Sequence, residues 1–556
     1  MGIGAALLMT PTTVAASVTS PTHPPLRGGA SSVVTAAALI AFLSLASRVL
    51  GLVRDRVLAS TYGAGATLDA YYAAFRIPDF VFNLIGLGAL SAAFLPVFVR
   101  VRQESRDRAF LFVSRLASDA MIVLAVLCGV GVLVAGPLFR VVAPGFSGAQ
   151  LALTTEMGRI LFLATFLLGA STVAGGVLQA ERRFVAFAAA PLLYNLGIIV
   201  GAVLLAPMVG PIGLAWGVVL GACAHAVLQV LAAWRLGVRW TWTPSWRDPE
   251  VRTTIRLLLP RMLGLASQQV QLSVVAAIAS TLTAGSLAVF TFANNIQHVP
   301  LSLIGISYAI AVFPQLAATA HRDRALFAEQ LGVAIRQVLL LAIPAAVLLL
   351  TLKAQIVRML LGSGAFDWQD TRRTLEVLEA MGIGVAPAML IPSLARAFYA
   401  WEDTRTPFVI GVGVDVLGIV LAGILGYRMG PRGLALGISI AAAVQAAMLL
   451  TVLHLRIGLY DGRSLVIAVA KFCLAGLVMG LVIQEAKVLL ALVVGTQTFL
   501  GIAIQGVCAG ALGVVAYFGM GFLVRSSEMA AIVHAFRHRA RAAVRLPFGG
   551  TEEARG

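Results

Sequence analysis

The chain alternates long apolar stretches with short polar loops from about residue 34 to residue 523. An apolar stretch of about 20 residues can cross the ~30 Å hydrocarbon layer of a bilayer as a helix. The pattern therefore predicts an all-α integral membrane protein with about fourteen transmembrane helices. The predicted spans are 34–53, 69–99, 116–140, 157–180, 185–207, 212–235, 255–281, 286–318, 332–354, 376–400, 407–427, 433–455, 464–484 and 494–523. The eighth is long enough to bend.

The composition excludes an ordinary soluble enzyme. Of the 556 residues, 60% are apolar and only 12% are charged, about half the charge of a soluble domain. Basic residues exceed acidic ones by 17, and in so apolar a chain this excess indicates anionic lipid, not nucleic acid. The sequence has no Walker loop and no common hydrolase motif. It also has no carboxylate set or metal-ligand cluster that would suit an enzyme of polyprenyl phosphates. We expect a protein that is not an enzyme and has no cofactor.

The loops differ in their arginine and lysine content. The loops that follow even-numbered spans carry more of these residues than the opposite set, and such loops face the cytoplasm. Both termini are therefore predicted to be cytoplasmic, with a disordered tail over 1–32 and a basic tail over 525–556. Apolar residues from Met529 to Val544 recur at helical spacing, so the basic tail is either a helix on the inner leaflet or a solubilising segment.

The chain repeats itself at an offset of about 220 residues. Six residues recur in order: Gly210, Pro211, Gly213, Leu214, Ala215 and Gly217 match Gly430, Pro431, Gly433, Leu434, Ala435 and Gly437. Each repeat holds six spans, an even number, so the copies enter the membrane from the same side as parallel repeats. We predict one six-helix lobe over 33–240 and a second over 241–460. Residues 461–524 add a helix pair, and rocking of the lobes would alternate access to a site between them.

Polar residues at membrane depth are costly and usually face protein or water. The second span carries a stripe of them on one helix face: Asp69, Tyr72, Arg76, Asp79, Asn83 and Gly86. The eighth span carries the matching set at offset 219: Asn295, His298, Ser302 and Gly305. Two facing stripes, one from each half, would line a hydrated cleft.

Arginines at this depth predict an anionic, phosphorylated substrate, because the planar guanidinium binds phosphate oxygens in pairs and stays charged. We expect Arg48, Arg76 and Arg261 inside the cleft and Arg54 at its outer rim. In the alternative interpretation the arginines are structural. Arg76 would then pair with Asp79, and Arg54 with Asp55 or Asp69.

Other polar residues in the spans have two open interpretations. His298 is a hydrogen-bonded cavity residue or a proton-coupling residue. Asp415, which matches Asn195 at offset 220, either makes a structural hydrogen bond or couples transport to Na⁺ or H⁺. His225 and Lys471 are predicted to snorkel or to contact neighbouring helices.

Several motifs resemble the MurJ/MviN family of lipid II flippases. They are SRVLGLVRDRVLASTYGAGATLDAYYAAFRIPD from Ser47, GALSAAFLPVF from Gly88, PRMLGLASQQVQL from Pro260, SLIGISYAIAVFPQLA from Ser302 and ARAFYAWEDTRTPF from Ala395. The similarity extends from about residue 33 to 524. By motif, Arg48, Arg54 and Asp69 occupy positions that the family uses, and Arg76 stands where a basic residue is typical.

The resemblance implies a fourteen-span member of the multidrug/oligosaccharidyl-lipid/polysaccharide exporter superfamily. Such a protein carries lipid II, an undecaprenyl-pyrophosphate-linked disaccharide-peptide, from the inner to the outer leaflet of the bacterial plasma membrane for cell-wall synthesis. An arginine-lined central cavity would hold the headgroup, and spans thirteen and fourteen would form a groove for the lipid tail. Membrane lipids and the cell-wall synthesis machinery are the implied partners. The sequence departs from many members at Phe82, Leu87 and Asn295, and Arg261 would compensate for the lost charge.

The absence of a nucleotide motif leaves three driving forces: a Na⁺ or H⁺ gradient, the membrane potential, or consumption of the product. Moving two negative charges outward across 100 mV is favoured by roughly 4.6 kcal/mol, so the potential alone would suffice. Three other functions remain open: export of another lipid-linked oligosaccharide, cation-coupled drug export, and a non-transporting cell-wall scaffold. A drug exporter would need an acidic cavity or a promiscuous aromatic pocket, which the basic stripe argues against.

Overall fold

The computed structural model describes residues 30–84, 90–457, 462–495 and 498–529, and within this part of the chain it contains helices and no strand. The predicted tails over 1–32 and 525–556 lie almost entirely outside the described residues. The elements of the first six predicted spans are α1 (Ala30–Tyr62), α2 (Ala66–Ala74), α3 (Arg76–Phe82), α4 (Leu90–Glu104), α5 (Arg106–Leu133), α6 (Ala135–Val142), α7 (Gly148–Ala180), α8 (Phe184–Val200), the π-helix η2 (Gly201–Leu205), α9 (Ala206–Val209) and α10 (Gly213–Arg235).

The next six predicted spans correspond to α11 (Pro249–Ser280), α12 (Ser286–Pro300), the π-helix η3 (Leu301–Ile306), α13 (Ser307–Thr319), α14 (Arg324–Thr351), α15 (Lys353–Leu360), α16 (Trp368–Ala400), α17 (Arg405–Met429) and α18 (Pro431–Ile457). The last two correspond to α19 (Gly462–Val493) and α20 (Phe499–Leu523). Eleven helices in the described residues are long and apolar enough to cross a membrane. The other three predicted spans fall on α1, on α2–α4 and on α11, so the count of fourteen stays a prediction.

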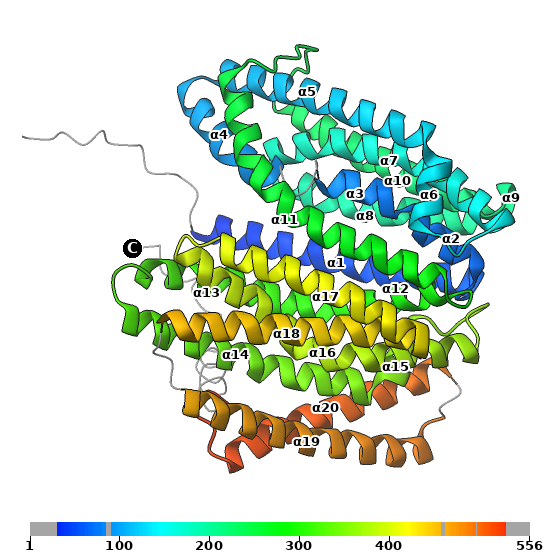
Figure 1. Cartoon of the computed structure of the whole chain (residues 1–556), viewed down its shortest axis with the longest axis vertical. Helices are drawn as coiled ribbons and strands as arrows, with labels where there is room; N and C mark the ends of the chain where they lie inside the picture. Colours follow the sequence, from blue (N-terminus) through cyan, green and yellow to red (C-terminus); the bar gives the residue numbers. More distant parts are fainter. Residues whose placement is uncertain (1–29, 85–89, 458–461, 496–497, 530–556) are drawn as a thin grey trace, which may run out of the picture.

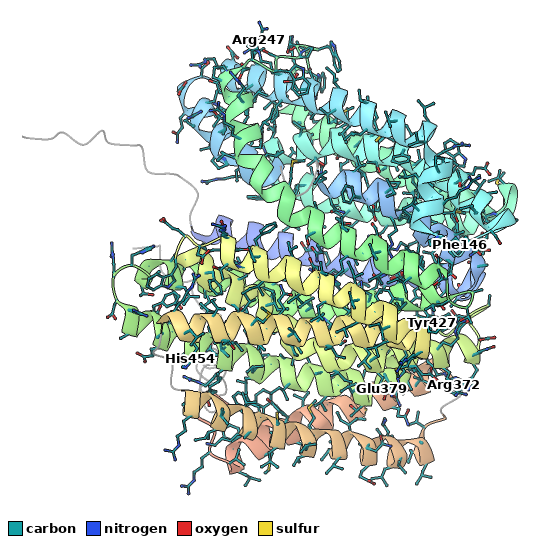
Figure 2. All side chains as sticks on the ribbon, in the orientation of Figure 1. Phe146, Arg247, Arg372, Glu379, Tyr427 and His454 are labelled. Atoms are coloured by element: carbon teal, nitrogen blue, oxygen red, sulfur yellow. The ribbon has the colours of Figure 1, made fainter. Side chains whose placement is uncertain are left out.

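The helices run side by side across the view in Figure 1. Phe146, Arg372 and Tyr427, which lie in or next to loops predicted on one membrane face, are at one end of the helices in Figure 2. Arg247 and His454, which lie in or next to the opposite set of loops, are at the other end. The direction from one end to the other is therefore the direction in which the chain crosses the bilayer, and the protein is a multi-pass membrane protein.

The same helix neighbours recur in the two halves. Helix α10 packs on α7 and α8 in the first half, as α18 packs on α16 and α17 in the second. Likewise α1 packs on α8 as α11 packs on α17, and α5 on α7 as α14 on α16. The repeated glycine motif explains part of this packing, because Gly213 and Gly433 each lie directly against the backbone of the preceding helix, where a Cβ would collide. Gly210 and Gly430 take positive φ angles of 77° and 63° in the tight turns that precede Gly213 and Gly433.

The second predicted span is broken, not a single straight helix. Helix α2 ends at Ala74 and α3 begins at Arg76, with Phe75 as the turn between them. A π-turn begins at Asn83 and Leu84, and the related positions of the eighth span lie in η3, at the expected bend. Single π-turns inside helices often mark functional sites. Gly86 and Leu87 lie outside the described residues.

Figure 1 shows α4, α5, α7 and α10 in one body and α12–α18 in another. Helix α11 runs obliquely between them and contacts α4 of the first body and α17 of the second. Helices α19 and α20 pack on each other at the edge of the second body, where α19 contacts α14 and α20 contacts α15.

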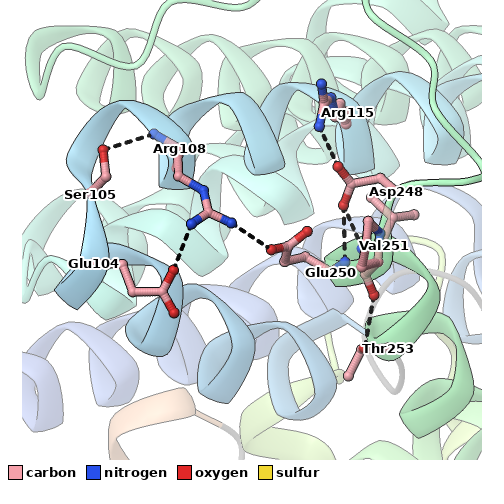
Figure 3. Close-up of polar contacts among 9 residues, drawn as sticks. Glu104, Ser105, Arg108, Arg115, Asp248, Glu250, Val251 and Thr253 are labelled. Carbon is pink, nitrogen blue, oxygen red and sulfur yellow. Dashed lines mark hydrogen bonds and ion pairs between the residues drawn. The ribbon is translucent and has the colours of Figure 1, made fainter.

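The loop between α10 and α11 is fixed to the first half by polar contacts. Hydroxyls of Ser114 and Ser118 on α5 bond its backbone, and Asp119 accepts the N–H of Ser245 at 2.9 Å. Arg115 pairs with Asp248, the N-cap of α11. Figure 3 shows this pair beside Arg108, which bridges carboxylates of α4 and α11. These contacts hold the start of α11 against helix α5 of the first half.

Candidate functional site

A cavity of about 710 Å³ lies between the first half and helices α11 and α12 of the second. Its walls come from α1, α2, α3, α7, α8 and α10, with one leucine from α11 and four residues from α12. The polar side chains that line it are Arg54, Tyr71, Tyr72, Arg76, Asp79, Asn83, Thr172, Gln179, Tyr194, His225, Gln229, Thr291, Asn294 and Asn295. Both charged arginines of this set belong to the first half.

Arg54 joins three helices at the cavity wall. Its Nη2 donates to Asp55 Oδ1 at 2.8 Å, and its Nη1 donates to Asn195 Oδ1 on α8 at 3.1 Å. The other oxygen of Asp55 accepts from Asn295 Nδ2 on α12 at 2.9 Å. Asp55 is thus the carboxylate that holds Arg54, one of the two alternatives for this arginine. With Nε also bonded to Asp55, three of the five guanidinium N–H groups have protein partners and two have none among the described residues.

The structure exchanges the predicted places of Arg48 and Arg54. Arg54, expected at the rim, lines the cavity, whereas Arg48, expected inside, does not. Arg48 is exposed and donates to the hydroxyl of Ser302 in η3. The reason is helix geometry: six residues correspond to about 600° of rotation, so the two side chains point about 120° apart. Only one of the two therefore faces this cavity from α1.

Arg76 and Asp79 face the cavity from α3. No hydrogen bond or ion pair joins their side chains in the described part of the chain, so the predicted pairing of Arg76 with Asp79 is not seen. Arg76 Nε is buried and has no hydrogen-bond partner there. A buried guanidinium with unused donors is unfavourable unless something else satisfies it.

Asp69 lies outside the cavity lining and connects the two halves. Its carboxylate accepts the backbone N–H groups of Gly285 at 2.6 Å and Ala288 at 2.8 Å, at the N-terminus of α12. Asp370 makes the converse contact, because it starts α16 and accepts the N–H of Ala64, before α2, at 2.8 Å. Asp69 lies in the first turn of α2, at the end of the helices where α12 begins, so it contacts α12 and not the cavity. Two carboxylates therefore hold the halves together at this end of the helices.

The second half contributes fewer of the predicted residues to the cavity. Asn295 lines it, but His298 and Ser302 do not, so the expectation of two equal facing stripes is wrong. The side chain of Arg261 lies outside the described residues. Asp415 is separate from the cavity and accepts a hydrogen bond from Ser267 Oγ on α11 at 2.6 Å.

Several cavity residues escaped the sequence reasoning. His225 does contact a neighbouring helix, through Ser171, but it also lines the cavity together with Gln229. The four-residue interval between them places both on one face of α10, which was a usable signal. Tyr194, Gln179 and Asn294 gave no comparable pattern. Lys471 contacts the turn that follows α20, because its Nζ donates to the carbonyl of Arg525 at 3.1 Å.

Comparison with known proteins identifies the family. The model of the family described as lipid II flippase MurJ matches residues 58–503 of the chain. The chain belongs to the MurJ family. It is 30% identical over 517 residues to a probable lipid II flippase MurJ of Bdellovibrio bacteriovorus, covering 91% of this chain and 98% of that protein. It is 31% identical over 463 residues to the Vibrio cholerae protein of the same description, covering 79% and 86%.

Solved structures show the same fold. A lipid II flippase MurJ in an inward closed conformation superposes with a TM-score of 0.74, at 23% identity, over 88% of this chain and 99% of that one. An inward-facing multidrug resistance transporter of the MATE family gives a TM-score of 0.64 at 18% identity, over 75% and 98%. The chain thus has the MurJ fold. Within it, Phe82 and Asn295, two of the expected departures from the MurJ pattern, both lie on the cavity wall.

Proposed function

We propose that this protein carries lipid II from the inner to the outer leaflet of the bacterial plasma membrane, with the diphosphate held by Arg54 and Arg76. The observation that carries the proposal is the cavity itself, which presents two arginines with unused N–H groups at membrane depth. A diphosphate cannot cross hydrocarbon without such partners, because an unpaired charge in lipid is prohibitive.

The charges in the cavity favour an anion that arrives at Arg76. The charge of Arg54 is partly balanced by an ion pair with Asp55. Arg76 forms no ion pair in the described part of the chain, although Asp79 lies near enough to interact with it electrostatically. Phosphate oxygens would accept from Arg76 and from the two remaining N–H groups of Arg54. The carboxylate of Asp79 would then restrict how far the anion enters the cavity, because like charges repel.

The lipid tail would stay outside the cavity. The outward faces of α19 and α20 carry exposed apolar side chains such as Leu477, Leu481 and Val515, which suits contact with hydrocarbon. We propose that the tail lies along this pair while the headgroup occupies the cavity. Both termini would face the cytoplasm, where the arginine-rich loops lie. Lipid II and membrane lipids are then the ligands, and no catalytic step is required.

The membrane potential would drive the cycle without a coupling ion. The loaded site carries two negative charges outward, which 100 mV favours by roughly 4.6 kcal/mol. The emptied site, with its arginines, is drawn inward by the same field. Asp415 then acts only as the acceptor for Ser267.

The test is leaflet-resolved labelling of lipid II in cells depleted of this protein and supplied with either the wild type or Arg76→Ala. We expect depletion to accumulate lipid II in the inner leaflet, the wild type to restore labelling outside, and Arg76→Ala to fail at normal expression. Outward labelling at the wild-type rate with Arg76→Ala would refute the headgroup site. Normal labelling in depleted cells would refute the flippase function.

A further inference from the structure

A second polar group lies on the part of the cavity wall that α7 and α10 form. Ser171 of α7 is fully buried, and its hydroxyl lies 2.7 Å from His225 Nδ1 and 2.9 Å from Gln229 Oε1, both on α10. His225 and Gln229 also line the cavity. Gly175 leaves room for the amide, because a Cβ there would lie 2.7 Å from Gln229 Oε1. We call Ser171, His225 and Gln229 the α7–α10 cluster.

The hydrogens in this cluster can be assigned from the contacts. Ser171 has a single hydroxyl hydrogen, and it is donated to Gln229 Oε1. His225 Nδ1 must therefore carry a hydrogen and donate to Ser171 Oγ. In the neutral imidazole, Nε2 is then an acceptor, and it has no partner within the described residues. Gln229 Nε2 remains as a donor, with no partner in the described part of the chain.

The cavity wall thus offers one acceptor and one donor on neighbouring turns of α10. If the Gln229 amide were turned over, the two roles would exchange and the pair would still hold one donor and one acceptor. A secondary amide has the complementary arrangement, since its N–H donates and its C=O accepts. Charged phosphate oxygens, which only accept, would leave the histidine nitrogen unused.

The second half shows that the fold does not require this cluster. At offset 220 the positions of Ser171, His225 and Gln229 are held by Ile391, Gln445 and Leu449. Leu449 is buried in an apolar core and Ile391 packs against that core. The same helix contact can therefore be made with hydrocarbon side chains. Polar groups at membrane depth that packing does not need are functional candidates.

We infer that the α7–α10 cluster binds a secondary amide of the transported headgroup, as a specificity site separate from the arginines. This inference rests on the proposed function, because it takes lipid II as the ligand. Lipid II is a disaccharide-peptide, so the amide comes either from an N-acylated sugar or from the peptide. The arginines would supply affinity for the diphosphate, and the cluster would select for what is attached to it.

The experiment measures the affinity of full-length protein in nanodiscs for two ligands: lipid II, and a polyprenyl diphosphate with the same tail and no sugar or peptide. The variant Gln229→Leu introduces the residue of the second half. We expect it to weaken lipid II binding roughly tenfold, the effect of one lost hydrogen bond, and to leave the sugar-free diphosphate unchanged. His225→Phe should do the same. The control Gln445→Leu, at the related position of the second half, should change neither affinity.

Two modified ligands locate the amide. Lipid II with N-deacetylated sugars, or with a shortened peptide, should bind the wild type as weakly as lipid II binds Gln229→Leu. Whichever ligand does so identifies the source, and Gln229→Leu should not weaken it further. Equal loss for lipid II and the sugar-free diphosphate, or no loss for lipid II, would overturn the inference while the flippase function stands. Failure of the wild type to bind either ligand would overturn both.

Discussion

The two halves of the molecule have the same helix neighbours but hold different residues at corresponding positions. Asn195 and its counterpart Asp415 accept hydrogen bonds from Arg54 and Ser267 respectively, so Ser267 stands in the second half where Arg54 stands in the first. Arg76 corresponds to Asn295 and Gln229 to Leu449. Consequently, the charged groups and most of the hydrogen-bonding groups face the cavity from the first half. The second half contributes mainly α12, whose polar side chains there are the uncharged Thr291, Asn294 and Asn295. The repeat provides two bodies that can move against each other, and only one of them is built to hold an anion.

The strongest test of this difference replaces Arg54 and its counterpart Ser267 by alanine. Arg54→Ala should abolish transport and also destabilise the protein, because Asp55 is left buried without its partner. The loss should be smaller than the roughly 3–5 kcal/mol for a fully buried pair, since the Arg54 side chain is 25% exposed. Ser267→Ala should leave transport intact. Thermal unfolding and a complementation assay measure the two effects. Equal loss of transport in both variants would show that the halves do not differ in this way.

The contact between the halves at Asp69 should have the next largest effect. Asp69→Ala removes the acceptor for two N–H groups at the start of α12, a change that costs about 0.5–2 kcal/mol at a helix N-terminus. Asp69→Asn should retain part of the contact and part of the stability. Thermal unfolding in detergent ranks the three proteins. An Asp69→Ala variant as stable as the wild type would mean that this contact does not hold the halves together.

The third test asks whether an ion gradient or the membrane potential drives transport. It uses Asp415, whose repeat-related residue in the first half is Asn195. With the potential as the sole driving force, Asp415→Asn should transport lipid II at nearly the wild-type rate, because an amide can still accept from Ser267. Transport into vesicles with an imposed potential, with and without a Na⁺ or pH gradient, measures this. Loss of a gradient-dependent component in Asp415→Asn alone would instead assign ion coupling to this carboxylate.

We expect the smallest change in stability for the contact between Arg115 and Asp248, which fixes the start of α11 to the first half. Burial raises the pKa of Asp248, but hydrogen bonds from Val251, Glu250 and Arg115 outweigh it and lower the pKa below its ordinary value. A carboxyl whose pKa is lowered by folding stabilises the protein above its unfolded pKa of about 3.9, and this contribution disappears as the pH falls through the folded value. Arg115→Ala should therefore lower stability at pH 7 and much less near pH 3. An equal loss at both pH values would contradict the pairing with Asp248.

The hydrophobic pattern was sufficient to predict the helices, and the glycine motifs were sufficient to predict the repeat, because both are local properties of the chain. Gly213 and Gly433 are glycines for the same reason, the close approach of the preceding helix. The polar stripe was predicted correctly for Arg76, Asp79 and Asn83, which lie on the cavity wall.

The remaining site residues depended on features that spacing does not encode. Asp69 contacts the start of α12, one turn before Tyr72, which lines the cavity, and nothing in the three- and four-residue spacing of the stripe marks where it leaves the cavity. Which face of α1 meets the cavity depends on how α1 packs on α8, so the places of Arg48 and Arg54 could not be read from their own span. Gln229 acquires its role through Ser171 on another helix.

The most direct measurement is a structure of the full-length protein with lipid II bound. We expect both phosphate groups in the cavity between α1 and α3, with their oxygens about 3 Å from the guanidinium nitrogens of Arg54 and Arg76. Diphosphate density outside this cavity, with both arginines in the positions described above and without contact to it, would contradict the assignment of the first half as the anion-binding body.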